Sequence, residues 1–262
     1  MKINFNGECC VPESTRQGYA VHNRTLGIPY VEDVPLHDRP LAIVGGGPSI
    51  IGHVDELKAW KGDIWAVNGA FRWCKAWGIR TVYFTLDPLA VVGDMELDPD
   101  EEAILAGWVD PKAIQKLSHA RLRLYHLDES NSFGPSSATM SLVLAPKCGY
   151  RKIVYFGCES SFREEKHAYP NDADYPGDLV VECGGRRFMT APTLYMQAQL
   201  ISEMIRRAPH IFSERSGGLM GAMVEHGDHD VIAGSRGIAH QVIKEEYHGG
   251  LCPFEIPLEE LA

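Results

Sequence analysis

Short runs of apolar residues alternate along this chain with segments whose apolar residues recur at helical spacing. The apolar runs predict buried β-strands at 41–44, 64–67, 81–85, 121–125 and 152–156, with a shorter one at 210–212. The helical spacing predicts helices at 50–60, 70–77, 111–119, 136–147 and 193–207. Because buried strands that alternate with helices form parallel sheets covered on both faces, we predict the α/β class, as a doubly wound, mainly parallel Rossmann-like sheet.

The pattern divides the chain into three parts. Residues 1–38 carry no strong periodicity and are interpreted as an N-terminal extension. Residues 39–232 make up the Rossmann-like domain, within which 158–187 is predicted to be a long polar loop. Residues 233–262 are predicted to form a C-terminal helical tail, with one helix from Ile238 to Tyr247.

The first predicted strand ends in a glycine turn, Gly45-Gly46-Gly47-Pro48-Ser49, and a helix follows. Glycines let a ligand approach the backbone closely, and the free N–H groups of a helix N-terminus suit a phosphate. The turn is neither the G-x-G-x-x-G fingerprint nor a P-loop. We therefore predict that Gly45, Gly46, Gly47 and Ser49 bind a nucleotide phosphate; the alternative is a tight turn without a ligand.

Polar residues that follow other strands are predicted to lie near this turn, because they also stand at the carboxyl ends of the strands, where ligands of such folds bind. Asn68 could hydrogen-bond a base or ribose, or cap a helix. Asp87 could bind a ribose hydroxyl or Mg²⁺, or cap the turn at Pro88.

Glu159 and His167 follow the strand at 152–156 and are the predicted catalytic residues. Histidine has the natural pKa for a general base near neutrality, so His167 is the candidate base. Glu159 could orient it, bind a metal or contact sugar hydroxyls. The alternative for His167 is a surface histidine in a loop.

The segment Ser213-Glu214-Arg215-Ser216-Gly217-Gly218 offers a hydroxyl, a charge pair and two glycines. We predict that Ser213, Gly217 and Gly218 contact the ligand, with Arg215 pairing a phosphate through its planar fork. The alternative is a flexible loop. Residues 226–230 crowd metal-capable side chains together, and we interpret them as a solvated loop.

Charge and cysteine usage narrow the function classes. The net charge of −10 argues against a nucleic-acid groove or an anionic membrane as the main partner. No apolar run has the length of a membrane span, and residues 1–8 lack a signal-peptide core. The seven cysteines contain no C-x-x-C pair, so we expect reduced thiols in a cytoplasmic protein, without a zinc site or disulfides. Homo-oligomerisation is left open.

Several stretches in this order resemble the MptE-like domain family, which includes archaeal 6-hydroxymethylpterin diphosphokinases and Maf flagellin-glycosylation proteins. They are the glycine turn 45–49, Ala66-Val67-Asn68, Gly157-Cys158-Glu159 with His167-Ala168-Tyr169, 190–196 and 213–219. The chain is more distantly similar to bacterial sialyltransferases, which open with Gly-Asn-Gly-Pro-Ser and bind CMP-sialic acid. This chain has Gly46 in place of that Asn, and Glu159 where the MptE-like family usually has Asp.

The resemblance implies a nucleotide-dependent transferase whose donor is a nucleotide or nucleotide sugar. We expect glycosyl transfer, with His167 taking the proton of an acceptor hydroxyl. One alternative is diphosphate transfer from ATP, with Mg²⁺ held by Asp87 and Glu159. The other is a binding module that keeps the nucleotide site without turnover.

Overall fold

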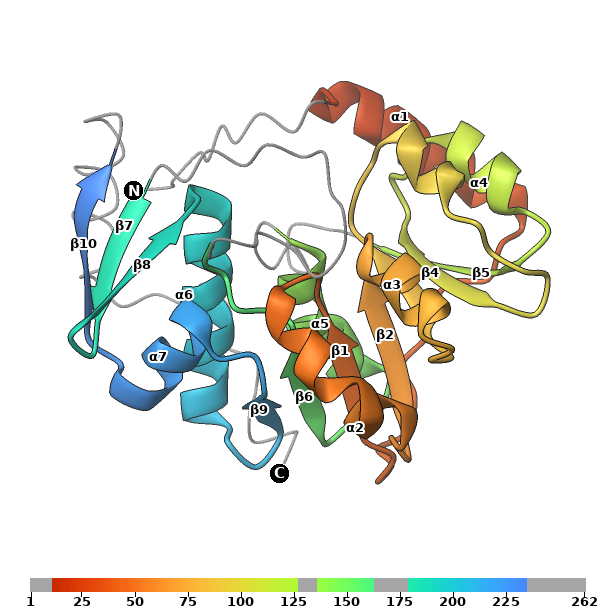
Figure 1. Cartoon of the computed structure of the whole chain (residues 1–262). Helices are drawn as coiled ribbons and strands as arrows, with labels where there is room; N and C mark the ends of the chain where they lie inside the picture. The colour runs from red at the N-terminus through yellow and green to blue at the C-terminus, as the bar shows by residue number, and fades with distance from the viewer. Residues whose placement is uncertain (1–10, 127–135, 163–178, 235–262) are drawn as a thin grey trace.

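A seven-stranded parallel sheet forms the centre of the protein (Figure 1). The computed structural model describes residues 11–126, 136–162 and 179–234. The strand order is β5-β4-β3-β2-β1-β6-β9. The strands are β1 (Leu41–Val44), β2 (Asp63–Val67), β3 (Val82–Thr85), β4 (Glu102–Ala106), β5 (Arg121–Tyr125), β6 (Ile153–Phe156) and β9 (Phe212–Glu214). The predicted doubly wound α/β fold is confirmed.

Helices connect these strands and cover the sheet. The helices are α1 (Glu13–Asn23), α2 (Val54–Lys58), α3 (Ala70–Ala76), α4 (Pro111–Leu117), α5 (Ser137–Lys147), α6 (Pro192–Arg207) and α7 (Gly218–His226). Short 3₁₀ helices are η1 (Arg24–Leu26), η2 (Pro48–His53) and η3 (Ala90–Asp94). Crossovers through α2, α3 and α4 step outward from β1 in one direction, and those through α5 and α6 step in the other. Because such crossovers are right-handed, the two sets lie on opposite faces.

The central strand β1 explains the continuous apolar run in the sequence. Its four residues are 0% exposed. It pairs in parallel with β2 on one side and β6 on the other, so that Leu41 lies between Asp63 and Ile153. A strand covered on both faces has no solvent side and shows no alternation.

Two parts of the fold differ from the prediction. Strand β4 was not predicted, because a run of acidic residues precedes it and its alanines have little strand preference. The predicted polar loop 158–187 is wrong at its end, where β7 (Leu179–Cys183) lies. With β8 (Arg186–Thr190) and β10 (His229–Gly234), β7 forms a second, antiparallel sheet in the order β10-β7-β8. The predicted tail helix 238–247 lies outside the described residues.

The N-terminal segment packs onto the sheet rather than standing apart from it. Helix α1 ends at Asn23, whose side chain is 0% exposed. Its Nδ2 donates hydrogen bonds to the carbonyl oxygens of Gly107 and Val109, at 2.9 and 2.8 Å. Further along, the N–H of Val31 donates to the carbonyl of Leu124. The segment therefore belongs to the folded unit.

We expect Asn23→Ala to lower the free energy of unfolding by roughly 2–6 kcal/mol, because it leaves two buried carbonyl acceptors without their donor and each costs about 1–3 kcal/mol. Denaturant titration measures this loss. The control is Gln17→Ala on the exposed side of α1, which should change stability by less than about 0.5 kcal/mol. Equal effects of the two variants would show that α1 contributes little to the fold.

Candidate functional site

The strand order reverses between β1 and β6, where the chain leaves one half of the sheet for the other. In open α/β sheets ligands bind outside the carboxyl ends of the strands at such a reversal. The glycine turn follows β1 at this point, and residues 157–161 follow β6. The next strand in the sheet, β9, leads into residues 215–218. We call these three segments the switch-point cluster.

Amide groups of the glycine turn are bound to the end of β6. The N–H of Gly45 donates to the carbonyl of Phe156, and the N–H of Gly47 donates to that of Gly157, both at 2.8 Å. The N–H of Ser49 donates to Oε1 of Glu159 at 2.5 Å. Among the described residues, the N–H of Gly46 has no partner. A phosphate at this turn would therefore find most of the amides already in use.

Close packing explains two of the three glycines. A Cβ at Gly45 would lie 2.5 Å from the carbonyl oxygen of Gly157 and 2.8 Å from Sγ of Cys158. A Cβ at Gly47 would lie 1.5 Å from Oε2 of Glu159. Because real side chains do not tolerate such distances, the turn requires glycine at both positions even without a ligand.

Glu159 lies in the middle of the switch-point cluster. Glu159 is 2% exposed, and its Oε2 is buried without a hydrogen-bond partner among the described residues. Its carbonyl accepts a hydrogen bond from the N–H of Met220 in α7 at 3.1 Å. A Cβ at Gly218 would lie 2.6 Å from Cβ of Glu159. The predicted residues of the glycine turn, Glu159 and Gly218 are thus in contact.

A second carboxylate caps the loop that leads into α7. Oε2 of Glu214 accepts from the N–H groups of Ser216 and Gly217, at 2.6 and 2.9 Å. Ser213 lies inside β9, paired with Val154, rather than in the loop after the strand. Arg215 lies 3.9 Å from the carboxylate of Glu56 and is more than half exposed. The protein's own carboxylates therefore bind both backbone segments at the switch point: Glu159 binds the glycine turn, and Glu214 binds the loop before α7.

The residue after Glu159, Ser160, is bound by hydroxyl and amide side chains from α6 and the end of β8, none of which was predicted as a site residue. Ser160 has a φ of 56°, a left-handed conformation that is uncommon for residues other than glycine. Its Oγ accepts from Nε2 of Gln197 at 2.9 Å, and its carbonyl accepts from Oγ1 of Thr190 at 2.7 Å. Strained backbone of this kind persists where its surroundings hold it, and it gathers at ligand sites.

Cys158 is not a nucleophile in this arrangement. Burial raises the pKa of its thiol, and the negative charge of Glu159 raises it further. The thiol is therefore neutral at physiological pH, whereas nucleophilic cysteines react as thiolates.

The predicted residues Asn68 and Asp87 form a separate group around the start of α5. Asn68, exposed and with a φ of 49°, accepts a hydrogen bond from Oγ of Ser137 at 3.3 Å. The same Oγ accepts from the N–H of Leu86, at 2.8 Å. Oδ1 of Asp87 accepts from the N–H of Leu89, and desolvation raises the pKa of the Asp87 carboxyl. We call this group the Ser137 cluster.

The strand order separates Asp87 from Glu159. They follow β3 and β6, with β2 and β1 between these strands. At ~4.8 Å per strand, the two strand ends are about 14 Å apart. No group of three metal-ligating side chains occurs in residues 11–126, 136–162 and 179–234. This separation disfavours a single Mg²⁺ ion shared by Asp87 and Glu159. The predicted base His167 lies outside the described residues.

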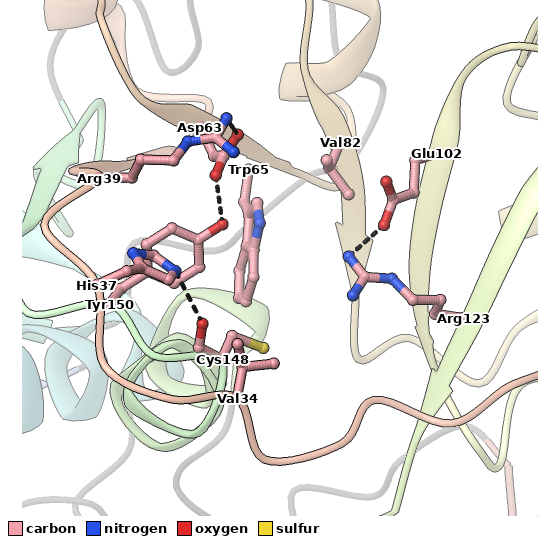
Figure 2. A pocket seen from close by; sticks show the side chains of 10 residues that line it. All are labelled: Val34, His37, Arg39, Asp63, Trp65, Val82, Glu102, Arg123, Cys148 and Tyr150. Carbon is pink, nitrogen blue, oxygen red and sulfur yellow. Dashed lines mark hydrogen bonds and ion pairs between the residues drawn. The ribbon is translucent and has the colours of Figure 1, made fainter.

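A cavity of about 280 Å³ lies at the opposite edge of the sheet, where the strands begin (Figure 2). Ion pairs join Arg39 to Asp63 and Arg123 to Glu102 on two sides of it. The hydroxyl of Tyr150 donates to Asp63 at 2.7 Å. Its charged side chains thus neutralise one another in pairs, and it contains none of the predicted site residues.

Comparison with protein-family models and with curated protein sequences gives no match to this chain, so the resemblance to the MptE-like family stays a prediction. In the part of the chain that the structure describes, no helix is long and apolar enough to cross a bilayer.

We expect Gly47→Ala to destabilise the protein by about 1–3 kcal/mol, because its Cβ would overlap the Glu159 carboxylate and force the turn to shift. Gly52→Ala is the matched control within η2, since a Cβ there has no neighbour within 4 Å. Thermal and urea unfolding measure both. The Glu159→Ala background should recover part of the loss from Gly47→Ala. Equal stability of the two alanine variants would contradict the seating of Glu159 under the turn.

Asp87→Asn should stabilise the protein at pH 7. Desolvation raises the pKa of the folded carboxyl, so ionisation of Asp87 opposes folding above that pKa. The gain should shrink as the pH falls toward the unfolded pKa of about 3.9, and disappear below it, where Asp87 is protonated in both states. Urea titrations at pH 7 and pH 3 test this. Exposed Asp100→Asn is the control. A gain at pH 3 as large as that at pH 7 would contradict the electrostatic explanation.

Proposed function

We propose that this chain is a nucleotide-dependent transferase that binds its donor across the switch point between β1 and β6 and transfers a glycosyl group from a nucleotide sugar. The position of the glycine turn, Glu159 and Gly218 at the reversal of strand order supports a nucleotide at this edge. The single observation that carries the choice of donor is the buried Glu159 carboxylate against the turn.

The carboxylate favours a donor rich in hydroxyls over a naked triphosphate. It takes the N–H of Ser49, and its negative charge repels a phosphate placed on the same side of the turn. The proposed contacts for the one or two phosphates of a nucleotide sugar are the N–H of Gly46 and the exposed guanidinium of Arg215, which would turn from Glu56 toward the phosphate. The separation of Asp87 from Glu159 counts against the Mg²⁺-dependent alternative.

In the proposed reaction the acceptor hydroxyl oxygen attacks the anomeric carbon of the donor sugar. The bond from that carbon to the phosphate oxygen breaks, and the nucleotide leaves with the electron pair. His167 is the proposed base that takes the hydroxyl proton. The proposed location is the cytoplasm, which suits the free thiols of Cys74, Cys148, Cys158 and Cys183.

A thermal-shift screen with CMP, UDP, GDP and ATP, each with and without Mg²⁺, tests this proposal. A ligand that binds only the folded protein stabilises it by about 2.7 kcal/mol at a hundred times its dissociation constant. We expect stabilisation by one of CMP, UDP or GDP without Mg²⁺. Stabilisation by ATP with Mg²⁺ alone would favour diphosphate transfer instead, and no response to any nucleotide would contradict the proposal.

Turnover separates an enzyme from a binding module. With the nucleotide sugar of the stabilising nucleotide, His167→Ala should abolish transfer or donor hydrolysis while leaving nucleotide binding nearly unchanged. His22→Ala, on the exposed side of α1, is the control. A wild-type protein that binds the nucleotide but releases no sugar would identify the non-catalytic module.

A further inference from the structure

We propose that Glu159 and Ser49 recognise the vicinal hydroxyls of the donor's ribose, so that the site accepts ribonucleotides and rejects deoxyribonucleotides. This inference rests on the proposed function, because it names the chemical group that the same site selects. It is carried by two buried polar atoms that have no partner among the described residues.

The first of these atoms is Oε2 of Glu159. The residue is 2% exposed, and in the described part of the chain only Oε1 has a donor, the N–H of Ser49. Buried carboxylate oxygens are normally hydrogen-bonded, and an unpaired one destabilises the folded protein. Within residues 11–126, 136–162 and 179–234, therefore, no donor satisfies this oxygen.

The second atom is Oγ of Ser49, which is also buried and has no partner among the described residues. Its own backbone N–H binds Glu159, so the hydroxyl and the carboxylate belong to one local group. A serine hydroxyl both donates and accepts, whereas an ionised carboxylate only accepts. Two adjacent hydroxyls satisfy this pair: one donates to Oε2 and the other exchanges a hydrogen bond with Oγ.

Other ligand chemistries fit this position less well. A phosphate would meet the Glu159 charge, and the N–H groups of Gly45 and Gly47 are bound to Phe156 and Gly157. A metal ion would find one free oxygen here, since the described residues bring no three metal-ligating groups together. A neutral hydroxyl needs one acceptor, which is what Oε2 offers.

Glu159 is held in place on both sides. Its carbonyl accepts from the N–H of Met220, and its Cβ packs against Gly218. Ser160, directly after it, is kept in a left-handed conformation by Gln197 and Thr190. A carboxylate fixed in this way loses little freedom on binding, and a site built to hydrogen-bond a hydroxyl discriminates strongly against an analogue that lacks it.

Calorimetric titration tests the inference with CMP, UDP and GDP and the 2′-deoxy and 3′-deoxy form of each. We expect wild type to bind the ribonucleotide about ten- to a hundredfold more tightly than a deoxy form, as for a hydrogen bond to a charged group. Glu159→Gln keeps an acceptor for Ser49 N–H but replaces Oε2 with a donor. It should therefore weaken binding of the ribonucleotide and reduce discrimination against the deoxy form that lacks the hydroxyl bound to Oε2, whereas the hydroxyl at Ser49 keeps its partner. Glu225→Gln, on an exposed side chain, should change neither.

The outcomes separate this inference from the proposed function. Equal affinity of wild type for ribo and deoxy forms would overturn the inference and leave nucleotide binding intact. Discrimination against both deoxy forms that is unchanged in Glu159→Gln would overturn it too, as would binding that requires Mg²⁺. If no nucleotide binds, the proposed function fails. Should Glu159→Gln melt below the assay temperature, Ser49→Ala replaces it: it keeps the backbone N–H, and undiminished discrimination would overturn the role of the hydroxyl.

Discussion

The close approach of the turn after β1 to the end of β6 determines the arrangement of this whole edge of the sheet. A Cβ at Gly157 would lie 2.1 Å from Cγ2 of Ile50 and 2.6 Å from the carbonyl oxygen of Gly45. The two strand ends therefore meet backbone to backbone, and Gly45, Gly47 and Gly157 are the residues that permit this. The polar side chain that follows, Glu159, is thereby brought directly under the turn.

This approach changes the role of the glycine turn. The sequence pattern suggested a row of free amides waiting for a phosphate, but the structure uses those of Gly45, Gly47 and Ser49 to join β1 to β6. In the loop before α7, the carboxylate of Glu214 likewise occupies the N–H groups of Ser216 and Gly217. Carboxylates thus occupy positions where a helix N-terminus attracts an anion. The turn is first a packing device, and its value to a ligand lies in the groups that it positions.

The sequence predicted the elements whose pattern is local and strong. Strands β1 and β6 are continuous apolar runs, and Glu159 was selected because it lies in the segment that follows β6. Strand β4 was missed because acidic residues precede it and its alanines have little strand preference, and its pairing with β3 and β5 is not visible in the local pattern. The sequence signal for the β7–β8 hairpin is the pair Gly184-Gly185. Both glycines have positive φ, as a two-residue hairpin turn requires. Gln197 was not predictable, since it reaches Ser160 only through the tertiary fold.

The two clusters at the carboxyl edge favour an extended ligand over a compact one. Glu159 and Asp87 follow strands that are separated by two others, with about 14 Å between the strand ends, which disfavours one ion shared by both. Both ends carry signs of constraint: Ser160 and Asn68 have positive φ, and Asp87 is a carboxylate whose pKa burial raises. Desolvated carboxylates and strained residues cost stability, and they collect where a ligand offsets that cost. For the proposed nucleotide-sugar donor, the ribose would lie at Glu159 and the other end of the molecule would extend along the strand ends toward Asp87.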